Sequence, residues 1–572
     1  MELQHESKKS QSSTLKRGLA AGLAVAGSAA VALGLYGYHA ETFHHDTSRL
    51  LADIASAKGI QVTFRPSSGS LVAPSGGAIT GFLFPKTDTS GALSSFDGRL
   101  SYEHAGGQYN FTLLNDKAFV TVEDVASGKL QRAECLTKDA IPPVALLTDA
   151  LKNARVIDAV ANPQFNVTGC SSGKLVEVFF ADEPYVFCSS STDGSVAVTG
   201  EDLSASVKLL QDNSQGVPAR ESLTTPAVLD ISKCEAVPTV TTSRRSLKEK
   251  TIQRAKDTLD VLTGARRLGA MGSTECGCKD GLKTCLFVHG LGYTDGETTD
   301  SFPDYFGKIE QQAKCCSSVK FLHIDTLNSP WYGDNLTEKL CNTAASLVNA
   351  KDKSAIENVA IVAHSMGNLV TAAALMNNKC GLAKSSKWIA LSGPIYGSMP
   401  ATTGITTFEK LPKTIQERLC YNDPNTKLDD PIVNVLLFFG LCPSRISIKS
   451  LAFKGSSQST PELDALFTKA GEQFGKSVSS SLCGINPVGL LSTDSIQLSI
   501  LGVASGHASL ENDGQVHIDS CRATVERSRY SKSWDGGNFY SPNVNHLDGT
   551  FRNGDGWWGN DRKPIKWFNC QF

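Results

Sequence analysis

The sequence predicts two folded regions of different class, a β-rich α+β region followed by an α/β domain with a mostly parallel sheet. Before about residue 235, short runs alternate apolar and polar residues between Gly, Ser and Asp turns. After about residue 280, apolar runs alternate with helical segments, which is typical of a parallel sheet covered by helices. A chain of 572 residues is also too long for one ordinary domain.

The chain starts with an apolar segment that is long enough to cross a membrane. Residues 18–40 carry no full charge, and a helix of this length spans a bilayer. Basic residues in 1–17 and acidic residues after 40 place the N-terminus in the cytoplasm by the positive-inside rule. A cleaved signal peptide stays open as the alternative, because Ala30 and Ala32 offer cleavage sites. We therefore expect a membrane-anchored or secreted protein.

The cysteines and the charge balance agree with an extracytoplasmic location. All sixteen cysteines follow the apolar segment, and an even number in an exported chain predicts disulfide bonds. Asn110, Asn166 and Asn335 begin tripeptides that accept N-glycans. The formal net charge of −2 gives no global basic field, so a nucleic-acid partner is not expected.

The N-terminal half contains strands but no motif of reactive residues. Residues 41–240 form the β-rich region, and we expect a binding or spacing role for it. The runs that predict strands there are Ile79–Phe84, Gln108–Leu114, Ala118–Val122 and Leu175–Phe180. Helical spacing in Ala145–Val160 favours an α+β class. A polar, basic connector is predicted at residues 241–270, before a catalytic domain at 271–572.

A strand, a tight turn and a helix together indicate a catalytic serine. The apolar strand Val359–Ala363 leads into Ala363-His-Ser365-Met-Gly367, and helical spacing follows. This is the small-x-Ser-x-Gly form of the nucleophile elbow, in which small residues allow the tight turn. The turn places the Ser365 hydroxyl at a helix N-terminus, where negative charge is favoured. The order of elements predicts an α/β-hydrolase fold with Ser365 as nucleophile.

An acyl-transfer site also needs hydrogen-bond donors for the oxygen that becomes negative in the tetrahedral intermediate. The strand Leu286–Val288 ends in His289-Gly-Leu291-Gly, where the glycines let the loop turn closely. We expect the backbone N–H groups of Leu291 and Met366 to form this oxyanion hole. His289 itself is expected to have a structural role.

The base and the acid follow the serine in the chain order of this fold. That order leaves His507, His517 and His546 as candidate bases, and His546 lies where the fold normally has its histidine. The run Ile496–Val503 predicts a strand, and Asp513 lies in the turn beyond it. An acid there holds the imidazole in the required tautomer. Asp519 is the alternative acid.

Five short motifs together resemble the secreted bacterial true lipases over about residues 280–570, while the N-terminal half has no counterpart. The family carries similar segments in the same order. They are His289-Gly-Leu291, His364-Ser-Met-Gly367, Gly393-Pro-Ile-Tyr-Gly397-Ser398, Asn512-Asp-Gly-Gln-Val516 and Asn545-His-Leu-Asp548. The resemblance implies Ser365, Asp513 and His546 as the triad, with Leu291 and Met366 as the oxyanion hole.

The same resemblance implies a structural calcium ion held by Asp548, two residues after the base. A hard cation needs several oxygen ligands, and Asp494 is a conceivable second carboxylate. Capping of the loop by Asp548 is the alternative. Two residues depart from the family pattern, because Ala363 replaces the first glycine of the elbow and Asn368 replaces a small residue after it.

The predicted activity is hydrolysis of carboxylic esters through an acyl-enzyme, with lipid esters as the favoured substrates and no cofactor required for the chemistry. A lid or cap is expected in an insertion at about 400–490, which contains the apolar run 432–440. A small-ester esterase, an acyltransferase or an amidase with the same triad stay open. A catalytically inactive cell-surface binding protein is the alternative from a different class.

Overall fold

The computed structural model describes two compact units, an N-terminal unit before residue 275 and a C-terminal unit formed by residues 275–556 and 560–572. In the N-terminal unit it describes most of residues 54–237, with the main gaps at 67–78, 137–149, 159–173 and 211–218. In the C-terminal unit it describes residues 276–572 except 421–441, several positions within 491–510, and 557–558. The predicted segments 18–40 and 241–270 and the apolar run 432–440 lie outside the described residues.

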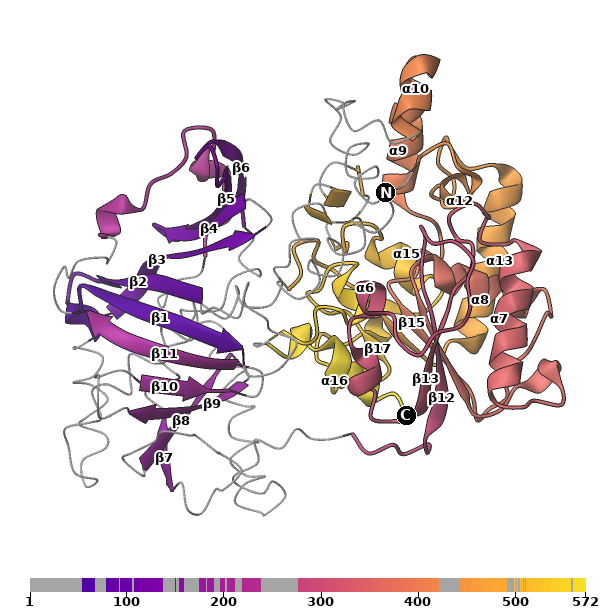
Figure 1. The fold of residues 1–572 in the computed structure, drawn as a ribbon, viewed down its shortest axis with the longest axis horizontal. Helices are drawn as coiled ribbons and strands as arrows, with labels where there is room; N and C mark the ends of the chain where they lie inside the picture. Colours follow the sequence, from indigo (N-terminus) through magenta and orange to yellow (C-terminus); the bar gives the residue numbers. More distant parts are fainter. Residues whose placement is uncertain are drawn as a thin grey trace. The chain divides into compact units, whose positions relative to one another are not determined.

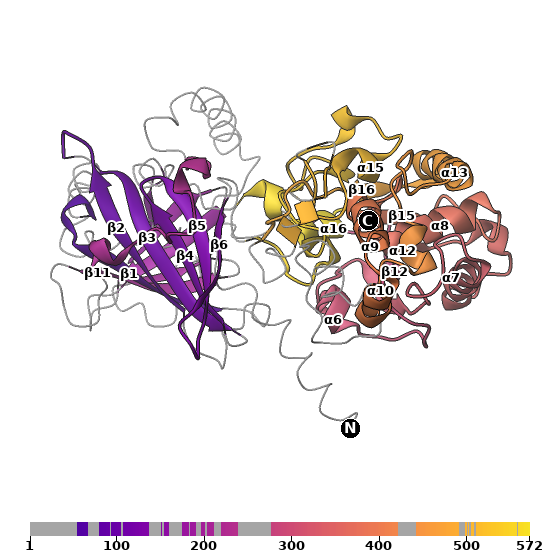
Figure 2. The same ribbon diagram turned by 90° about the horizontal axis from the view of Figure 1, so that it is seen from above.

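The N-terminal unit contains one eleven-stranded antiparallel sheet (Figures 1 and 2). Its order is β6-β5-β4-β3-β2-β1-β11-β10-β9-β8-β7, so two meanders join where β1 pairs with β11. The strands are β1 Gly59–Pro66, β2 Ile79–Thr87, β3 Leu93–His104, β4 Gly107–Leu114, β5 Lys117–Asp124, β6 Leu130–Cys135, β7 Arg155–Asp158, β8 Lys174–Phe180, β9 Glu183–Ser189, β10 Val196–Thr199 and β11 Leu203–Leu210.

Alternating burial explains why these segments form strands. In β10 the valines Val196 and Val198 are buried, whereas the residues between and after them are partly exposed. All four predicted runs of this region lie within observed strands. The helix predicted for Ala145–Val160 is wrong over Arg155–Asp158, which is strand β7 and pairs with β8. Cross-strand pairing with β8 overrides the local helical spacing at this edge of the sheet.

The C-terminal unit is built on a six-stranded parallel sheet in the order β13-β12-β14-β15-β16-β17. The first strand of this sheet along the chain is β12. The next strand, β13, pairs on one side of β12, and β14 pairs on the other, so the carboxyl ends of β12 and β14 flank a topological switch point. The strands are β12 Lys283–Val288, β13 Cys316–Leu322, β14 Val359–His364, β15 Lys387–Leu391, β16 Ser480–Leu482 and β17 Phe539–Tyr540.

Both faces of this sheet are covered, which explains its continuous apolar strands. In β14, Ile361 packs with residues of α7, α8 and α13, whereas Val362 packs on the opposite face with residues of α6 and α16. Figure 1 shows α7 and α8 on one side of the strands and α6 and α16 on the other. The helices are α6 Pro303–Phe306, α7 Asp334–Leu347, α8 Met366–Met376, α9 Met399–Glu409, α10 Lys413–Cys420, α12 Ile446–Lys449, α13 Pro461–Ser477, α15 Ile518–Arg522 and α16 Pro564–Asn569.

One strand that the sequence predicts in this unit does not occur. The described residues of Ile496–Val503 are helical, and the buried Leu498 and Leu501 share one helical face at a spacing of three. A short apolar run fits a buried helix as well as a buried strand, which is why its pattern is ambiguous. The sheet position next to β15 is taken instead by β16.

Seven disulfides occur among the described residues, and they fit an extracytoplasmic protein. One lies in the N-terminal unit and six in the C-terminal unit. The pairs are Cys135–Cys234, Cys276–Cys570, Cys278–Cys315, Cys285–Cys316, Cys341–Cys380, Cys420–Cys442 and Cys483–Cys521. Within the described part of the chain, no helix has both the length and the apolar character to span a bilayer.

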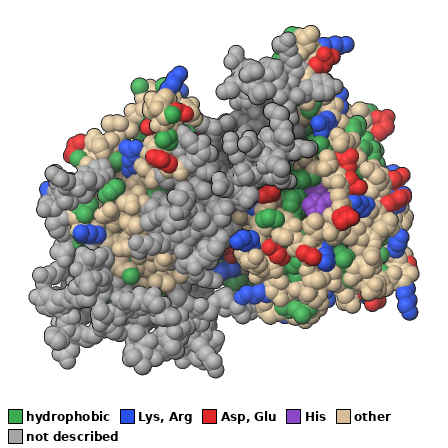
Figure 3. All heavy atoms as spheres, viewed as in Figure 1, with side chains coloured by type: hydrophobic (Ala, Val, Ile, Leu, Met, Phe, Trp, Pro, Cys, Tyr) green, Lys and Arg blue, Asp and Glu red, His purple; other side chains and the backbone are tan. Residues whose placement is uncertain are grey.

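The three glycan-acceptor sites differ in exposure. Asn110 lies in β4 with only 2% of its surface exposed, so its side chain is not open to a glycan in the folded chain. Asn335 is exposed near the start of α7, and Asn166 lies outside the described residues. Basic and acidic side chains are interspersed on the described surface in the view of Figure 3.

Candidate active site

Ser365 occupies a strained turn between β14 and α8. Its φ of 52° and ψ of −129° are unusual for a residue with a side chain, and α8 starts at the next residue, Met366. The turn depends on close packing, because a Cβ atom at Gly367 would lie 2.7 Å from the carbonyl oxygen of His289. The strand before the turn and the helix after it together fix where the Ser365 hydroxyl points.

The structure brings Ser365, His546 and Asp513 into one hydrogen-bonded line. The His546 Nε2 atom lies 2.9 Å from Ser365 Oγ, and its Nδ1 atom lies 2.9 Å from Asp513 Oδ2. All three side chains are buried. The hydroxyl, the imidazole and the carboxylate therefore have the contacts that activate a serine nucleophile.

The Asp513 carboxylate is held by its own loop. Its Oδ1 atom accepts hydrogen bonds from the backbone N–H groups of Gln515 at 3.0 Å and Val516 at 2.7 Å. This leaves Oδ2 for the His546 ring. The backbone N–H of His546 donates to the backbone carbonyl oxygen of Asp513 at 2.8 Å. The acid loop and the base loop are thus joined by backbone and side chain.

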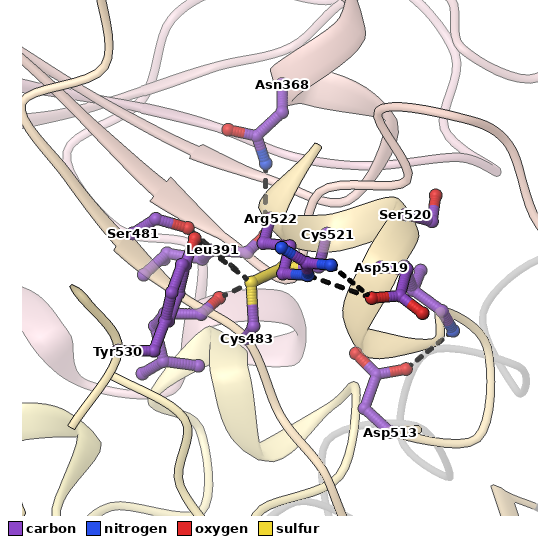
Figure 4. Close-up of a disulfide and its surroundings, with 12 residues drawn as sticks. Asn368, Leu391, Ser481, Cys483, Asp513, Asp519, Ser520, Cys521, Arg522 and Tyr530 are labelled. Atoms are coloured by element: carbon purple, nitrogen blue, oxygen red, sulfur yellow. Dashed lines mark hydrogen bonds and ion pairs between the residues drawn. A yellow bond between two sulfur atoms is a disulfide. The ribbon is translucent and has the colours of Figure 1, made fainter. Parts of the chain in front are cut away.

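A disulfide holds the acid loop against the sheet (Figure 4). Cys483 follows β16 and pairs with Cys521 of α15, the helix that follows the acid loop. The alternative acid, Asp519, lies in α15, where it forms an ion pair with Arg522 at 2.8 Å instead of contacting His546. Of the two candidate acids, Asp513 is therefore the one that contacts His546.

The two alternative bases also lie away from the serine. His507 and His517 form an edge-to-face pair with ring centroids 6.1 Å apart, and His517 stacks near Phe453. Burial lowers the pKa of His507 to about 4 and also lowers the pKa of His517. Ser365 Oγ is hydrogen-bonded to His546 Nε2 at 2.9 Å, so among the described residues His546 is the histidine that the fold presents to the serine.

Two backbone N–H groups are free beside the serine. Met366 is the first residue of α8, and Leu291 follows Gly290 in the loop after β12. Neither N–H has an acceptor among the described residues. Gly290 lies directly against the nucleophile, because a Cβ atom there would be 2.6 Å from Ser365 Cβ. Both donors predicted from the sequence are thus available near Ser365.

A buried hydrogen-bonded chain that the sequence reasoning missed links the three loops of the site. The Gly290 N–H donates to Tyr305 Oη at 2.6 Å, Tyr305 Oη lies 2.6 Å from His364 Nδ1, and His364 Nε2 lies 2.9 Å from the His546 carbonyl oxygen. A carbonyl only accepts, so His364 carries its proton on Nε2. Burial, more than any other cause, keeps the pKa of His364 well below its ordinary value, so Nδ1 accepts from the Tyr305 hydroxyl.

Asn368 accounts for one departure from the family pattern. Its Nδ2 atom donates to the carbonyl oxygens of Ala363 at 2.9 Å and Leu391 at 3.0 Å, and its Oδ1 accepts from Trp388 Nε1 at 3.1 Å. Figure 4 shows the bond to Leu391. One side chain therefore joins the start of α8 to the ends of β14 and β15.

Asp548 is fully buried, and its carboxylate accepts hydrogen bonds from its own loop and from a distant segment of the chain. Its Oδ2 atom accepts from the N–H groups of Leu490 at 2.8 Å and Asn545 at 3.0 Å, and Oδ1 accepts from Asn553 Nδ2 at 2.7 Å. Among the described residues no group of three His, Cys, Asp or Glu gathers as a metal site, and Asp494 lies outside them. These donors do not fit a hard cation, and calcium binding stays a prediction.

Two solved structures to which the chain is similar show faint likenesses. No family model matches the sequence, and no curated protein matches it. One solved structure is a lipase-esterase related protein from Clostridium acetobutylicum, 19% identical over 36% of this chain and 85% of that chain, with a TM-score of 0.18. Another is dipeptidyl peptidase 4 of Porphyromonas gingivalis, 10% identical over 56% of this chain and 58% of that chain, with a TM-score of 0.13. Scores this low carry no argument about fold or activity.

The buried histidines predict how stability depends on pH. Burial lowers the pKa of His289 from 6.5 to about 4, so below pH 6.5 the unfolded chain binds a proton that the folded chain does not. The free energy of unfolding should therefore fall as the pH falls, by about 2 kcal/mol from His289 alone between pH 7 and pH 5. Urea unfolding at the two pH values measures this. A His289→Asn variant should show a smaller fall, and an unchanged fall would contradict the assignment.

Proposed function

We propose that this protein is a serine hydrolase with an α/β-hydrolase fold that cleaves carboxylic esters through an acyl-enzyme. The observation that carries the proposal is the line from Ser365 Oγ to His546 Nε2 and from His546 Nδ1 to Asp513 Oδ2, at 2.9 Å each. The parallel sheet, with the serine at the carboxyl end of β14, supports the fold.

In the first half-reaction, Ser365 Oγ attacks the ester carbonyl carbon while His546 Nε2 takes the hydroxyl proton. The carbonyl oxygen becomes negative and accepts hydrogen bonds from the N–H groups of Leu291 and Met366. The carboxylate of Asp513 stabilises the imidazolium that forms. The intermediate then collapses, His546 gives the proton to the leaving alcohol, and the acyl group stays on Ser365.

In the second half-reaction, water replaces the alcohol. His546 takes a proton from the water molecule as its oxygen attacks the acyl carbon, and the same two N–H groups stabilise the second oxyanion. Collapse releases the carboxylic acid, and the proton returns from His546 to Ser365 Oγ. Atoms and charges balance with water as the only co-reactant, so the step needs no cofactor.

The substrate class that we favour is a lipid ester. The support is the set of five motifs shared with secreted bacterial true lipases. The disulfides fit an extracytoplasmic enzyme, and we expect the segment 18–40 to be its membrane anchor or signal peptide.

Covalent labelling tests the nucleophile. A fluorophosphonate should label the purified ectodomain once, and the label and ester turnover should both disappear in Ser365→Ala, because Ser365 Oγ is the hydroxyl that lies 2.9 Å from His546 Nε2. Turnover of esters from two to eighteen carbons, with and without an emulsion interface, then separates lipase from esterase. Intact turnover in Ser365→Ala would end the proposal, and preference for short soluble esters would end its lipid part.

Replacement of the acid tests its role against a matched aspartate. Asp513→Asn should lower kcat by roughly 10³- to 10⁴-fold, because an amide favours the wrong tautomer of His546. Asp519→Asn is the control, since Asp519 pairs with Arg522 within α15. Steady-state kinetics on the same ester compares the two variants. Equal losses in both, or a loss only in Asp519→Asn, would contradict the assignment of the acid.

Two disulfides with matched loop lengths separate stability from catalysis. Cys483–Cys521 spans 38 residues around the acid loop, and Cys341–Cys380 spans 39 residues between α7 and the end of α8. Removing either pair by double Cys→Ala replacement should cost about 4 kcal/mol of unfolding free energy, from loop-closure entropy. Only the Cys483–Cys521 variant should also lose kcat, since only it frees the acid loop. Equal kcat values in the two folded variants would contradict this.

A further inference from the structure

The carbonyl group of Gly290 accepts two hydrogen bonds from buried side chains. The Thr326 hydroxyl donates to it at 2.7 Å, and His289 Nδ1 lies 2.8 Å away. Both side chains are fully buried. Neither takes part in the chemistry proposed above, so the reason for placing two donors on one carbonyl beside the nucleophile is open.

The tautomer of His289 follows from its second ring nitrogen. The Ile324 N–H donates to His289 Nε2 at 3.2 Å, so Nε2 is an acceptor without a proton. Burial lowers the pKa of His289 to about 4, and the ring is therefore neutral at pH 7. Its one proton lies on Nδ1, which donates to the Gly290 carbonyl. Every contact of the ring agrees with this single state.

The carbonyl of Gly290 and the N–H of Leu291 belong to one peptide group. The peptide is planar, and the described chain has no cis peptide bonds, so the Leu291 N–H points opposite to the Gly290 carbonyl. The backbone N–H of Gly290 itself donates to Tyr305 Oη. Two donors on the carbonyl and an acceptor on the N–H leave the loop little freedom to rotate.

We propose that Thr326 and His289 are positioning residues that orient the Leu291 N–H as an oxyanion donor toward the substrate oxygen at Ser365. The inference rests on the proposed function, since it assigns a role within that site. Without the pair, the peptide group between Gly290 and Leu291 can tilt, and the donor loses direction as negative charge develops. The pair acts through the backbone and touches no reacting atom.

Thr326→Val tests the proposal because valine keeps the shape and removes the hydroxyl. We expect fluorophosphonate labelling of Ser365 and kcat to slow by about tenfold, less than the loss of a whole oxyanion donor, with KM nearly unchanged. Affinity for a boronic acid, which forms a charged tetrahedral adduct, should fall in proportion to kcat/KM. The pH profile of labelling should stay in place, because the contacts of His546 are unchanged.

Two further variants distinguish the loss of this hydrogen bond from a general loss of structure. Thr326→Ser keeps the hydroxyl and should retain most of the labelling rate. Thr337→Val is the matched control, since Thr337 is a buried threonine of α7 whose hydroxyl bonds only to carbonyl groups at the start of its own helix. It should match the wild type in labelling rate even where it lowers stability.

The outcomes separate the two proposals. A wild-type ectodomain that no fluorophosphonate labels contradicts the proposed function itself. Normal labelling of the wild type, with Thr326→Val as fast as Thr337→Val, contradicts the positioning role alone. A loss in Thr326→Val that appears in KM with kcat unchanged, or that Thr326→Ser shares in full, shows a packing effect and also overturns it.

Discussion

The site depends on one buried imidazole, that of His546, which needs a hydrogen-bond partner at each ring nitrogen. Those partners come from residues 181 and 33 positions earlier in the chain, so no local structure can supply them. The sheet supplies Ser365 by ending β14 in a strained turn. The Cys483–Cys521 disulfide holds the acid loop on the sheet. The Asp548 carboxylate joins the base loop to a distant segment, because its Oδ2 atom accepts from the backbone N–H groups of Asn545 and Leu490. The turn, the disulfide and the Asp548 carboxylate each restrict the motion of one of the three segments that carry Ser365, Asp513 and His546.

The other histidines near the site are kept neutral, whereas the proposed mechanism requires His546 to gain and lose a proton. His289 and His364 are buried, and burial lowers the pKa of both. Each has one nitrogen that accepts and one that donates, so each ring is satisfied only in a single neutral tautomer. A second imidazolium beside His546 would oppose the protonation of His546 that the proposed mechanism requires. The neutral rings of His289 and His364 therefore link neighbouring loops by hydrogen bonds of fixed direction without adding charge to the site.

Much of the C-terminal sheet could be predicted from the sequence, because its strands are apolar on both faces and its serine lies between a strand and a helix. The three residues of the triad came from chain order and motif, and the structure brings them together. The segment Ile496–Val503 was predicted wrongly, since a short apolar run has no period that separates a strand from a buried helix. Thr326 gave no signal, because its role depends on a contact across 36 residues with a backbone carbonyl. The disulfide pairing was likewise beyond sequence reasoning.

Hydrogen bonding around the turn explains Asn368, one of the two departures from the pattern of the lipases. An elbow with a small residue at position 368 would leave the Trp388 indole N–H without the acceptor that Asn368 now provides. A buried polar group without a partner costs about 1–3 kcal/mol, so a polar side chain is required where a tryptophan packs beneath the turn. The Asn368 amide also donates to the carbonyl of Ala363 at the end of β14. The tryptophan and the asparagine therefore depend on each other, and the strained serine is supported by both.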